Sequence, residues 1–320
     1  MQPAFDYLMA RKLYEAIKEN KTVETEYSQG VYQLLSLIAI EEDRKLLFEY
    51  SNIELSDDMK YDLVCYALAN TSVEIASQFC EYIKKLMNYS AGEFREIFER
   101  IILPVSNVPN HPLGSILLDG FLRDFEKPAQ RDIWWSVPTY LRDNFDAEWR
   151  CYTEIDTGGI TLSNEEYNLG LPLILIWRLS SVENDVRREC RLKLTEWGIN
   201  NQLQFFKLFC YCTDINDEQV LEDIFAIAYG IALSQNVQDE YLRDFSDWIM
   251  KNVFSDEGLI KYENVVIRYY CTGIVKMAIC KEVCSKVLES RLPPPYSYQT
   301  SIMPACEDAF DAKGCLAMVL

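Results

Sequence analysis

Few side chains in this chain of 320 residues could carry out chemistry. His111 is its one histidine, so we expect no Ser/His/Asp triad, no catalytic Cys/His pair and no multi-histidine metal site. His111 lies in a proline-rich turn, where we expect it to hydrogen-bond the local turn rather than to act as an acid or base. This composition excludes many classes of enzyme.

Cysteines, glycines and carboxylates form no catalytic or cofactor motif. Cys210 and Cys212, and Cys280 and Cys284, lack the CxxC spacing of a thiolate metal site, and we expect them to pack inside helices. The segment Asp156-Thr157-Gly158-Gly159 has no lysine and no preceding buried strand, so it does not fit a phosphate-binding loop. Acidic runs lie in links or at helix beginnings, where water or the helix dipole favours negative charge. We therefore predict no catalysis, no metal and no cofactor.

The densest cluster of aromatic and charged side chains is Arg131-Asp132-Ile133-Trp134-Trp135-Ser136. Exposed tryptophans beside an arginine are typical of a protein-binding hot spot, so Arg131, Trp134 and Trp135 are candidate binding residues. Burial is the alternative interpretation. On a helix, Arg131 and Trp135 share a face one turn apart, so the guanidinium could stack on the indole and pair with a neighbouring helix.

Helices must position these residues, because the alternation typical of strands is almost absent. Capping-box spacing marks three helix starts, at Ser163 with Glu166, Ser180 with Glu183, and Asn216 with Gln219. Further helices are predicted at about 4–18, 26–40, 56–69, 71–88, 91–103, 114–124, 129–143, 202–212, 237–253, 263–278 and 280–290.

The segment 216–232 predicts a helix covered on most of its surface. Apolar residues recur at helical spacing, namely Val220, Ile224, Ala228 and Ile231. Three adjacent apolar residues make this stripe wider: Leu221, Phe225 and Ala232. Small residues, among them Gly230, would let a neighbouring backbone come close. With helix pairs roughly 35 to 45 residues apart, the pattern predicts an all-α fold, an α-solenoid of degenerate HEAT-like or TPR-like hairpins.

Prolines divide the predicted array. Residues 1–103 form an N-terminal helical block, and 104–112 form a proline-rich turn, because proline lacks a backbone donor and forces extended geometry on the residue before it. Residues 113–290 form the helical-repeat array. Three further prolines begin an irregular tail at 291–320.

Charge and composition limit the partners. The net charge of −19 repels phosphate backbones and anionic headgroups, so we expect no direct nucleic-acid or membrane binding. The acidic surface is explained by solvation, and it can also serve as a docking surface for a basic partner. No leader sequence opens the chain, and the apolar run from Leu169 to Trp177 is interrupted by Pro172, so we expect a cytoplasmic protein with reduced cysteines.

Three ordered segments resemble the C-terminal helical-repeat region of bacterial antiviral STAND ATPases of the Avs type. The first is similar to a His-Pro-hydrophobic block followed by Pro-x-x-Arg-Asp-x-x-Trp-Ser, here His111-Pro112-Leu113 and Pro128 to Ser136. The second is Trp177-Arg178-Leu179-Ser180-Ser181 with Val186-Arg187-Arg188, and the third runs from Asn216-Asp217 to Leu233. The chain departs from the family pattern at Gly114-Ser115, Asp119 and Val182-Glu183.

The resemblance covers about residues 105 to 300 and implies a sensor. In such proteins the repeat array binds a phage protein, such as a terminase or portal protein, and the upstream ATPase then oligomerises and switches on an effector. Neither ATPase nor effector is encoded in this chain, so oligomerisation is expected only in the full-length ATPase. The alternative is a generic HEAT-like scaffold unrelated to defence, which composition alone would favour.

Overall fold

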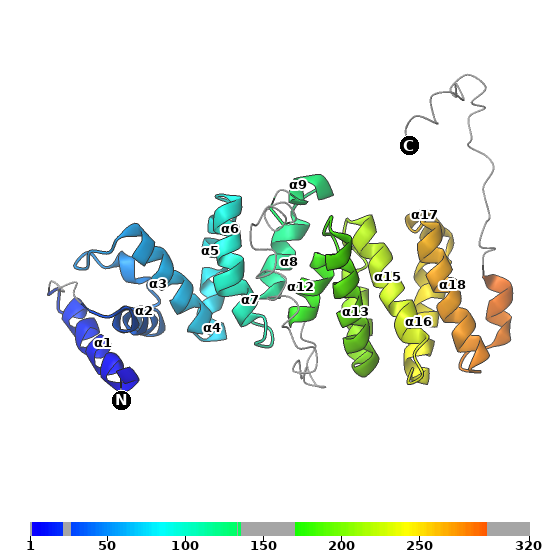
Figure 1. The fold of residues 1–320 in the computed structure, drawn as a ribbon, viewed down its shortest axis with the longest axis horizontal. Coiled ribbons are helices and arrows are strands. Elements are labelled where there is room, and N and C mark those ends of the chain that lie inside the picture. Colours follow the sequence, from blue (N-terminus) through cyan, green and yellow to red (C-terminus); the bar gives the residue numbers. More distant parts are fainter. Residues whose placement is uncertain (1, 22–26, 133, 136–169, 293–320) are drawn as a thin grey trace, which may run out of the picture. The chain divides into compact units, whose positions relative to one another are not determined.

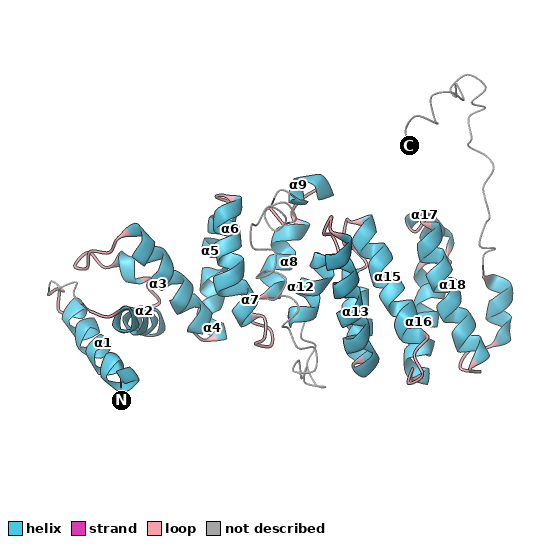
Figure 2. Ribbon diagram, viewed as in Figure 1, coloured by secondary structure: helices cyan, strands magenta, loops and turns pink. Residues whose placement is uncertain are grey.

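The computed structural model describes residues 2–21, 27–132, 134–135 and 170–292. Within these ranges the chain consists of helices and turns and contains no strand (Figure 2). The predicted all-α class is therefore confirmed. The chain divides into two compact units, Met1–Tyr241 and Leu242–Leu320. The predicted irregular tail, from residue 293 onward, and the capping box at Ser163 lie outside the described residues.

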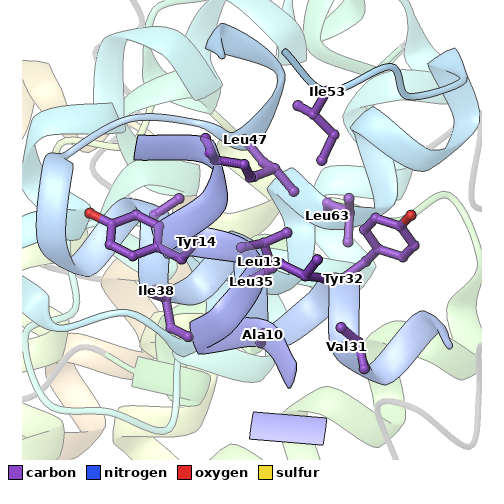
Figure 3. Packing of buried hydrophobic residues seen from close by; sticks show 12 residues of the cluster. Ala10, Leu13, Tyr14, Val31, Tyr32, Leu35, Ile38, Leu47, Ile53 and Leu63 are labelled. Atoms are coloured by element: carbon purple, nitrogen blue, oxygen red, sulfur yellow. The ribbon is translucent and has the colours of Figure 1, made fainter. Parts of the chain in front are cut away.

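The first unit begins with three helices that pack in chain order, α1 (Gln2–Lys18) on α2 (Gln29–Asp43) and α2 on α3 (Asp57–Asn70) (Figure 1). Serine side chains cap α2 and α3, because Ser28 accepts from Val31 N and Ser56 accepts from Met59 N. The helices enclose a cluster of buried side chains drawn in Figure 3, of which Leu35, Leu13 and Leu63 are among the members.

Two predicted helices between residues 71 and 105 differ in the structure. The segment 71–88 is split into α4 (Val73–Ala76), the 3₁₀ turn η2 (Ser77–Phe79) and α5 (Cys80–Met87). The helix that starts at α6 (Ala91–Ile97) continues through the π-helical turn η3 (Phe98–Ile102) into α7 (Leu103–Val105). It therefore passes Pro104, at which we had expected the turn to begin. The wider π turn, in which Leu103 N bonds Phe98 O, accommodates the proline ring.

The next helices surround the candidate site. They are α8 (Ser115–Arg123), α9 (Pro128–Asp132), α12 (Gly170–Arg178), α13 (Asn184–Asn200), α14 (Gln202–Cys212) and α15 (Glu218–Ala232). Helix α12 packs on α8 and on α13, and α13 packs on α14 and α15. Packing between neighbours in chain order is what a solenoid requires. The repeat architecture itself stays a prediction.

The apolar stripe of α15 is buried as predicted, except that Leu221 is half-buried. Asp223 lies on the same buried side and is 1% exposed. Its Oδ1 accepts a hydrogen bond from Arg191 Nη1 of α13 at 2.9 Å, and burial raises the pKa of this carboxyl group. The stripe therefore contains an ion pair that ties α13 to α15.

The second unit is built on α16 (Asp239–Asn252), within which the boundary falls, α17 (Asp256–Lys261), α18 (Val265–Cys280) and η4 (Lys286–Arg291). Trp248 meets Tyr262 edge-on, with ring centroids 6.4 Å apart. The helix predicted at 280–290 is corrected to a turn and the 3₁₀ helix η4. Glu282 in this turn has a positive φ of 60°, a conformation that stops α18 from continuing.

Candidate functional site: a buried arginine–tryptophan network

Arg131 is the centre of the site and is fully buried, with 0% of its surface exposed. Its Nη2 donates to Asp217 Oδ2 at 2.6 Å and its Nη1 donates to Asn216 Oδ1 at 2.7 Å. The guanidinium also lies 4.8 Å from the ring centroid of Trp177. Arg131 therefore joins α9 to the beginning of α15 and to α12.

Asp217 and Asn216 each have a second function in the local structure. Asp217 Oδ1 accepts from Gln219 N and Val220 N at 3.1 Å each, so this side chain caps α15. Asn216 Nδ2 donates to the carbonyl oxygens of Phe125 and Glu126, at 2.8 and 3.2 Å. The loop before α9 is thereby fixed to the loop before α15.

Trp135 is also buried, at 1% exposure. Its Nε1 donates to the carbonyl oxygen of Trp177 at 2.9 Å, and the guanidinium of Arg178 lies 5.6 Å from its ring centroid. The rings of Phe94 and Phe98 meet it edge-on. The two segments therefore exchange arginine–tryptophan pairs. Arg131 of the first segment stacks on Trp177 of the second, and Arg178 of the second stacks on Trp135 of the first.

Asp119 of α8 extends the network to the surface. Its Oδ1 accepts from Trp177 Nε1 at 2.9 Å, and its Oδ2 accepts from Tyr211 Oη at 2.6 Å and from Arg123 Nε at 2.8 Å. Asp119 is 1% exposed, whereas Tyr211 is 38% exposed. The Arg123 guanidinium lies 5.1 Å from the Tyr211 ring centroid. We call the eight side chains of this set the Arg–Trp network: Asp119, Arg131, Trp135, Trp177, Arg178, Tyr211, Asn216 and Asp217.

Two of the three residues singled out from the sequence are thus placed differently from a binding hot spot. Arg131 and Trp135 are buried, which favours the alternative interpretation and corrects the expectation that a partner could contact them. Arg131 stacks on Trp177 and not, as the helical spacing suggested, on Trp135. Trp134 is half-buried against Phe121 and Phe125. A binding role for Trp134 stays a prediction.

Six members of the network were missed as site residues: Asp119, Trp177, Arg178, Tyr211, Asn216 and Asp217. Each lies in or near a segment with a recognisable motif, but no motif indicates which segment it faces. Tyr211 gave no signal beyond its place between two cysteines. A buried charged residue inside an apolar helix, such as Asp119 among Leu117, Leu118 and Phe121, is the signal that could have indicated a pairing.

The polar groups of this network bond one another and thereby hold helices together. The carboxylates of Asp119 and Asp217 face arginines, and both indole N–H groups donate to oxygen. His111 is 4% exposed, and its Nδ1 accepts from Leu113 N at 3.3 Å, which confirms the expected bond within the local turn. Among the described residues, no three His, Cys, Asp or Glu side chains are grouped so that they could hold a metal ion.

The chain matches no family model, no curated protein and no solved structure. In the ranges that the structure describes, no helix has the length and apolar character needed to cross a bilayer.

Proposed function

We propose that this chain is the target-recognition region of an antiphage STAND ATPase of the Avs type, and that it binds a phage protein on a helical surface without catalysing a reaction. The observation that carries the proposal is the convergence of the three segments of the resemblance. Arg131 of the first segment bonds Asn216 and Asp217 of the third, 85 and 86 positions away. Trp135 of the first bonds Trp177 of the second.

The contacts among the three segments give a physical reason why the three motifs occur together. Residues that contact one another in a buried network must be present together, because a missing partner leaves a buried charge or donor unpaired. Three separate motifs that complete one network are therefore a signature of one folded region. Their buried residues hold the fold, so the surface that binds the target must consist of exposed residues.

The network reaches the protein surface on helix α14. Leu203, Lys207 and Tyr211 follow one another at four-residue steps on α14, and all three are exposed. Tyrosine and arginine are typical of binding hot spots, and Asp119 holds both Tyr211 and Arg123 in place. Preorganised side chains lose little entropy on binding. We therefore place part of the target contact on α14.

Binding would activate the full-length protein by differential affinity. A target shifts the ATPase from an inactive to an active form only as far as it prefers the active form. A surface of on the order of 1,000 Å² would recognise the shape of a folded phage protein rather than a short peptide.

Co-expression tests the proposal. The chain, or the full-length ATPase that contains it, is expressed with a tagged phage terminase large subunit or portal protein, with a phage lysis enzyme as the control bait. We expect retention by the terminase or the portal protein alone. Leu203→Glu should abolish capture, and Val73→Glu, at a similarly exposed position on α4, should not. If neither bait retains the chain or the full-length ATPase, the sensor function is wrong.

A further inference from the structure

Helix α18 carries apolar side chains on two sides. The stripe that includes Ile267, Cys271 and Ile274 is buried. On the other side, Val265 is 51% exposed and Tyr269 is 60% exposed. A helix that is apolar on most of its surface is normally covered on most of its surface. The exposed side of α18 therefore presents an apolar surface that another segment can cover.

This exposed side continues along the helix. Val265, Tyr269 and Lys276 are all exposed, and their spacings of four and seven residues place them on one side of α18. We call these three residues the α18 face. The face is apolar near the beginning of the helix and cationic toward its end.

The cationic end of the α18 face belongs to a cluster of lysines and an arginine. Helix α18 contains no aspartate or glutamate, although the chain has a net charge of −19. Beyond its end, Lys281, Lys286 and Arg291 are exposed, and η4, which carries the last two, packs on α18. Among the described residues, neither Lys276 nor any of these three pairs with a carboxylate. The cluster can therefore accept carboxylates.

Residues 307–320, which lie outside the described part of the chain, have a sequence complementary to the α18 face. Carboxylates at Glu307, Asp308 and Asp311 come first, and the apolar run from Cys315 to Leu320 comes last. In the α18 face the apolar residues come first and the cation comes last. The two orders match when the segments run antiparallel, because each carboxylate then meets a cation and each apolar part meets an apolar part.

The connection between η4 and this segment is long enough for such a contact. Residues 293–306 form the connection, and a chain of this length spans up to roughly 45 Å when extended. Helix α18 has 16 residues and is therefore only about 24 Å long. Within one chain the effective concentration of such a segment is on the order of millimolar. A contact too weak to hold separate molecules together is then well populated.

We propose that residues 307–320 cover the α18 face and run antiparallel to α18. The carboxylates lie against Lys276 and Lys281, and the apolar run lies against Val265. A contact of this kind opens and closes without unfolding of the helix, so Cys280 beside the lysines stays reactive in native buffer. A protein that binds the α18 face must first displace the segment.

This proposal does not depend on the proposed function. The target contact is placed on α14, which belongs to the first unit, whereas α18 and residues 307–320 belong to the second. Capture of a phage protein and occupancy of the α18 face are therefore measured separately.

Carbodiimide cross-linking of the full chain tests the contact, because the reagent joins a carboxylate to an amine only where the two touch. The cross-linked chain is digested and analysed by mass spectrometry. We expect links from the three carboxylates of the segment to Lys276 or Lys281. Lys85, an exposed lysine on α5, is the control and should give none. Absence of links to the α18 lysines, or equally frequent links to Lys85, overturns the proposal.

Mixed isotopes identify the occupant of the face. Equal amounts of ¹⁵N-labelled and unlabelled chain are combined and cross-linked. A segment that covers its own chain gives linked peptides that carry the same label. Mixed-label links as frequent as same-label links would show that a second copy occupies the face, and this result overturns the assignment to the chain's own segment.

Variants that keep every charge separate a specific contact from general attraction between opposite charges. Leu316→Ser with Met318→Ser removes apolar contact from the segment, and Val265→Ser removes it from the face. Each should lower the yield of links to Lys276 roughly three- to tenfold and leave the urea midpoint unchanged. Val73→Ser, an exposed position on α4, should leave the yield unchanged. An unchanged yield in both α18-contact variants overturns the proposal.

Discussion

Arg131 is held at once by a carboxylate, an amide and an indole ring. A buried ion pair adds little net stability over apolar residues of the same shape, but removal of one partner leaves the other charge uncompensated. The contribution of Arg131 to stability is therefore best measured by substituting it.

Arg131→Met is expected to lower the free energy of unfolding by about 3–5 kcal/mol, because Asp217 is left buried without its cation. Urea unfolding followed by circular dichroism measures the change. Arg188→Met, at an exposed position, is the control and should shift stability by less than about 0.5 kcal/mol. Similar midpoints for the two variants would mean that the network contributes nothing to the fold.

His111 gives the chain a pH dependence with a defined sign. Burial lowers its pKa from the ordinary value of 6.5, and its Nδ1 already accepts the N–H of Leu113. The unfolded chain therefore binds a proton at a higher pH than the folded chain does. Stability contributed by the neutral imidazole is fully present above about pH 6.5 and is lost as pH falls below it toward the lowered pKa.

His111→Gln can accept the same N–H bond without titrating. Between pH 7.5 and 5.5 the wild-type urea midpoint should fall more than that of His111→Gln. Carboxyl groups such as Asp223, whose pKa burial raises, act in the opposite direction in both proteins, so the difference isolates His111. Parallel midpoints across this range would show that His111 is not linked to folding.

At the scale of elements, periodicity predicted where helices lie but not how each one begins. Ser180 was expected to cap a helix, yet its Oγ donates to Trp177 O, and the N-cap of α13 is Glu183. Asn216 was expected to cap α15, but Asp217 does so, because Asn216 bonds Arg131 and the loop before α9. Either neighbour can cap a helix in isolation, and only tertiary contacts decide between them.

The candidate site shows the same limit. The sequence placed Arg131 and Trp135 on one helix face, and it identified the segments that contain Trp177 and Asp217. Their crossed pairing depends on which helices become neighbours in space, and this is not encoded in spacing within one segment. Composition made these residues candidates for a binding surface, but the network uses them to hold the fold.

Close helix packing was expected at Gly230, but the structure places it at Gly198. A Cβ atom on Gly198 would collide with the Ile231 side chain of α15, whereas one on Gly230 would meet Thr195 at an ordinary 3.4 Å. Gly198→Ala should therefore destabilise the chain by about 1–3 kcal/mol. Gly230→Ala, the matched control, should be neutral or stabilise by up to about 1 kcal/mol, because alanine favours helix. Equal effects in thermal unfolding would contradict the packing of α13 on α15.

At the scale of the whole molecule, buried residues hold the fold, and under the proposed function exposed residues bind the partner. The Arg–Trp network and the stripe of α15 use buried charge and aromatic area inside the first unit. Under the proposed function, exposed residues such as Leu203 supply the surface for a partner. Selection for binding can then change the surface while the network preserves the fold.

The two compact units are expected to differ in stability. The described part of the second unit, Leu242–Leu292, is shorter than domains of roughly 60 residues, which already bury too little surface to be more than marginally stable. Buried thiols report on each unit separately, because Cys190 and Cys212 lie in the first and Cys271 lies in the second. Burial raises the pKa of Cys190 to about 12 and that of Cys271 well above its ordinary value, so neither forms thiolate while folded.

Pulsed alkylation at increasing urea, read by mass spectrometry, measures when each thiol is released. Cys280, which was expected to pack inside a helix, is instead exposed, so it should react without urea. Cys271 should become reactive at a lower urea concentration than Cys190 and Cys212, because unfolding of the small unit does not require disruption of the Arg–Trp network. Release of all three buried thiols at one urea concentration would instead show that α16, which contains the boundary, couples the units into a single cooperative structure.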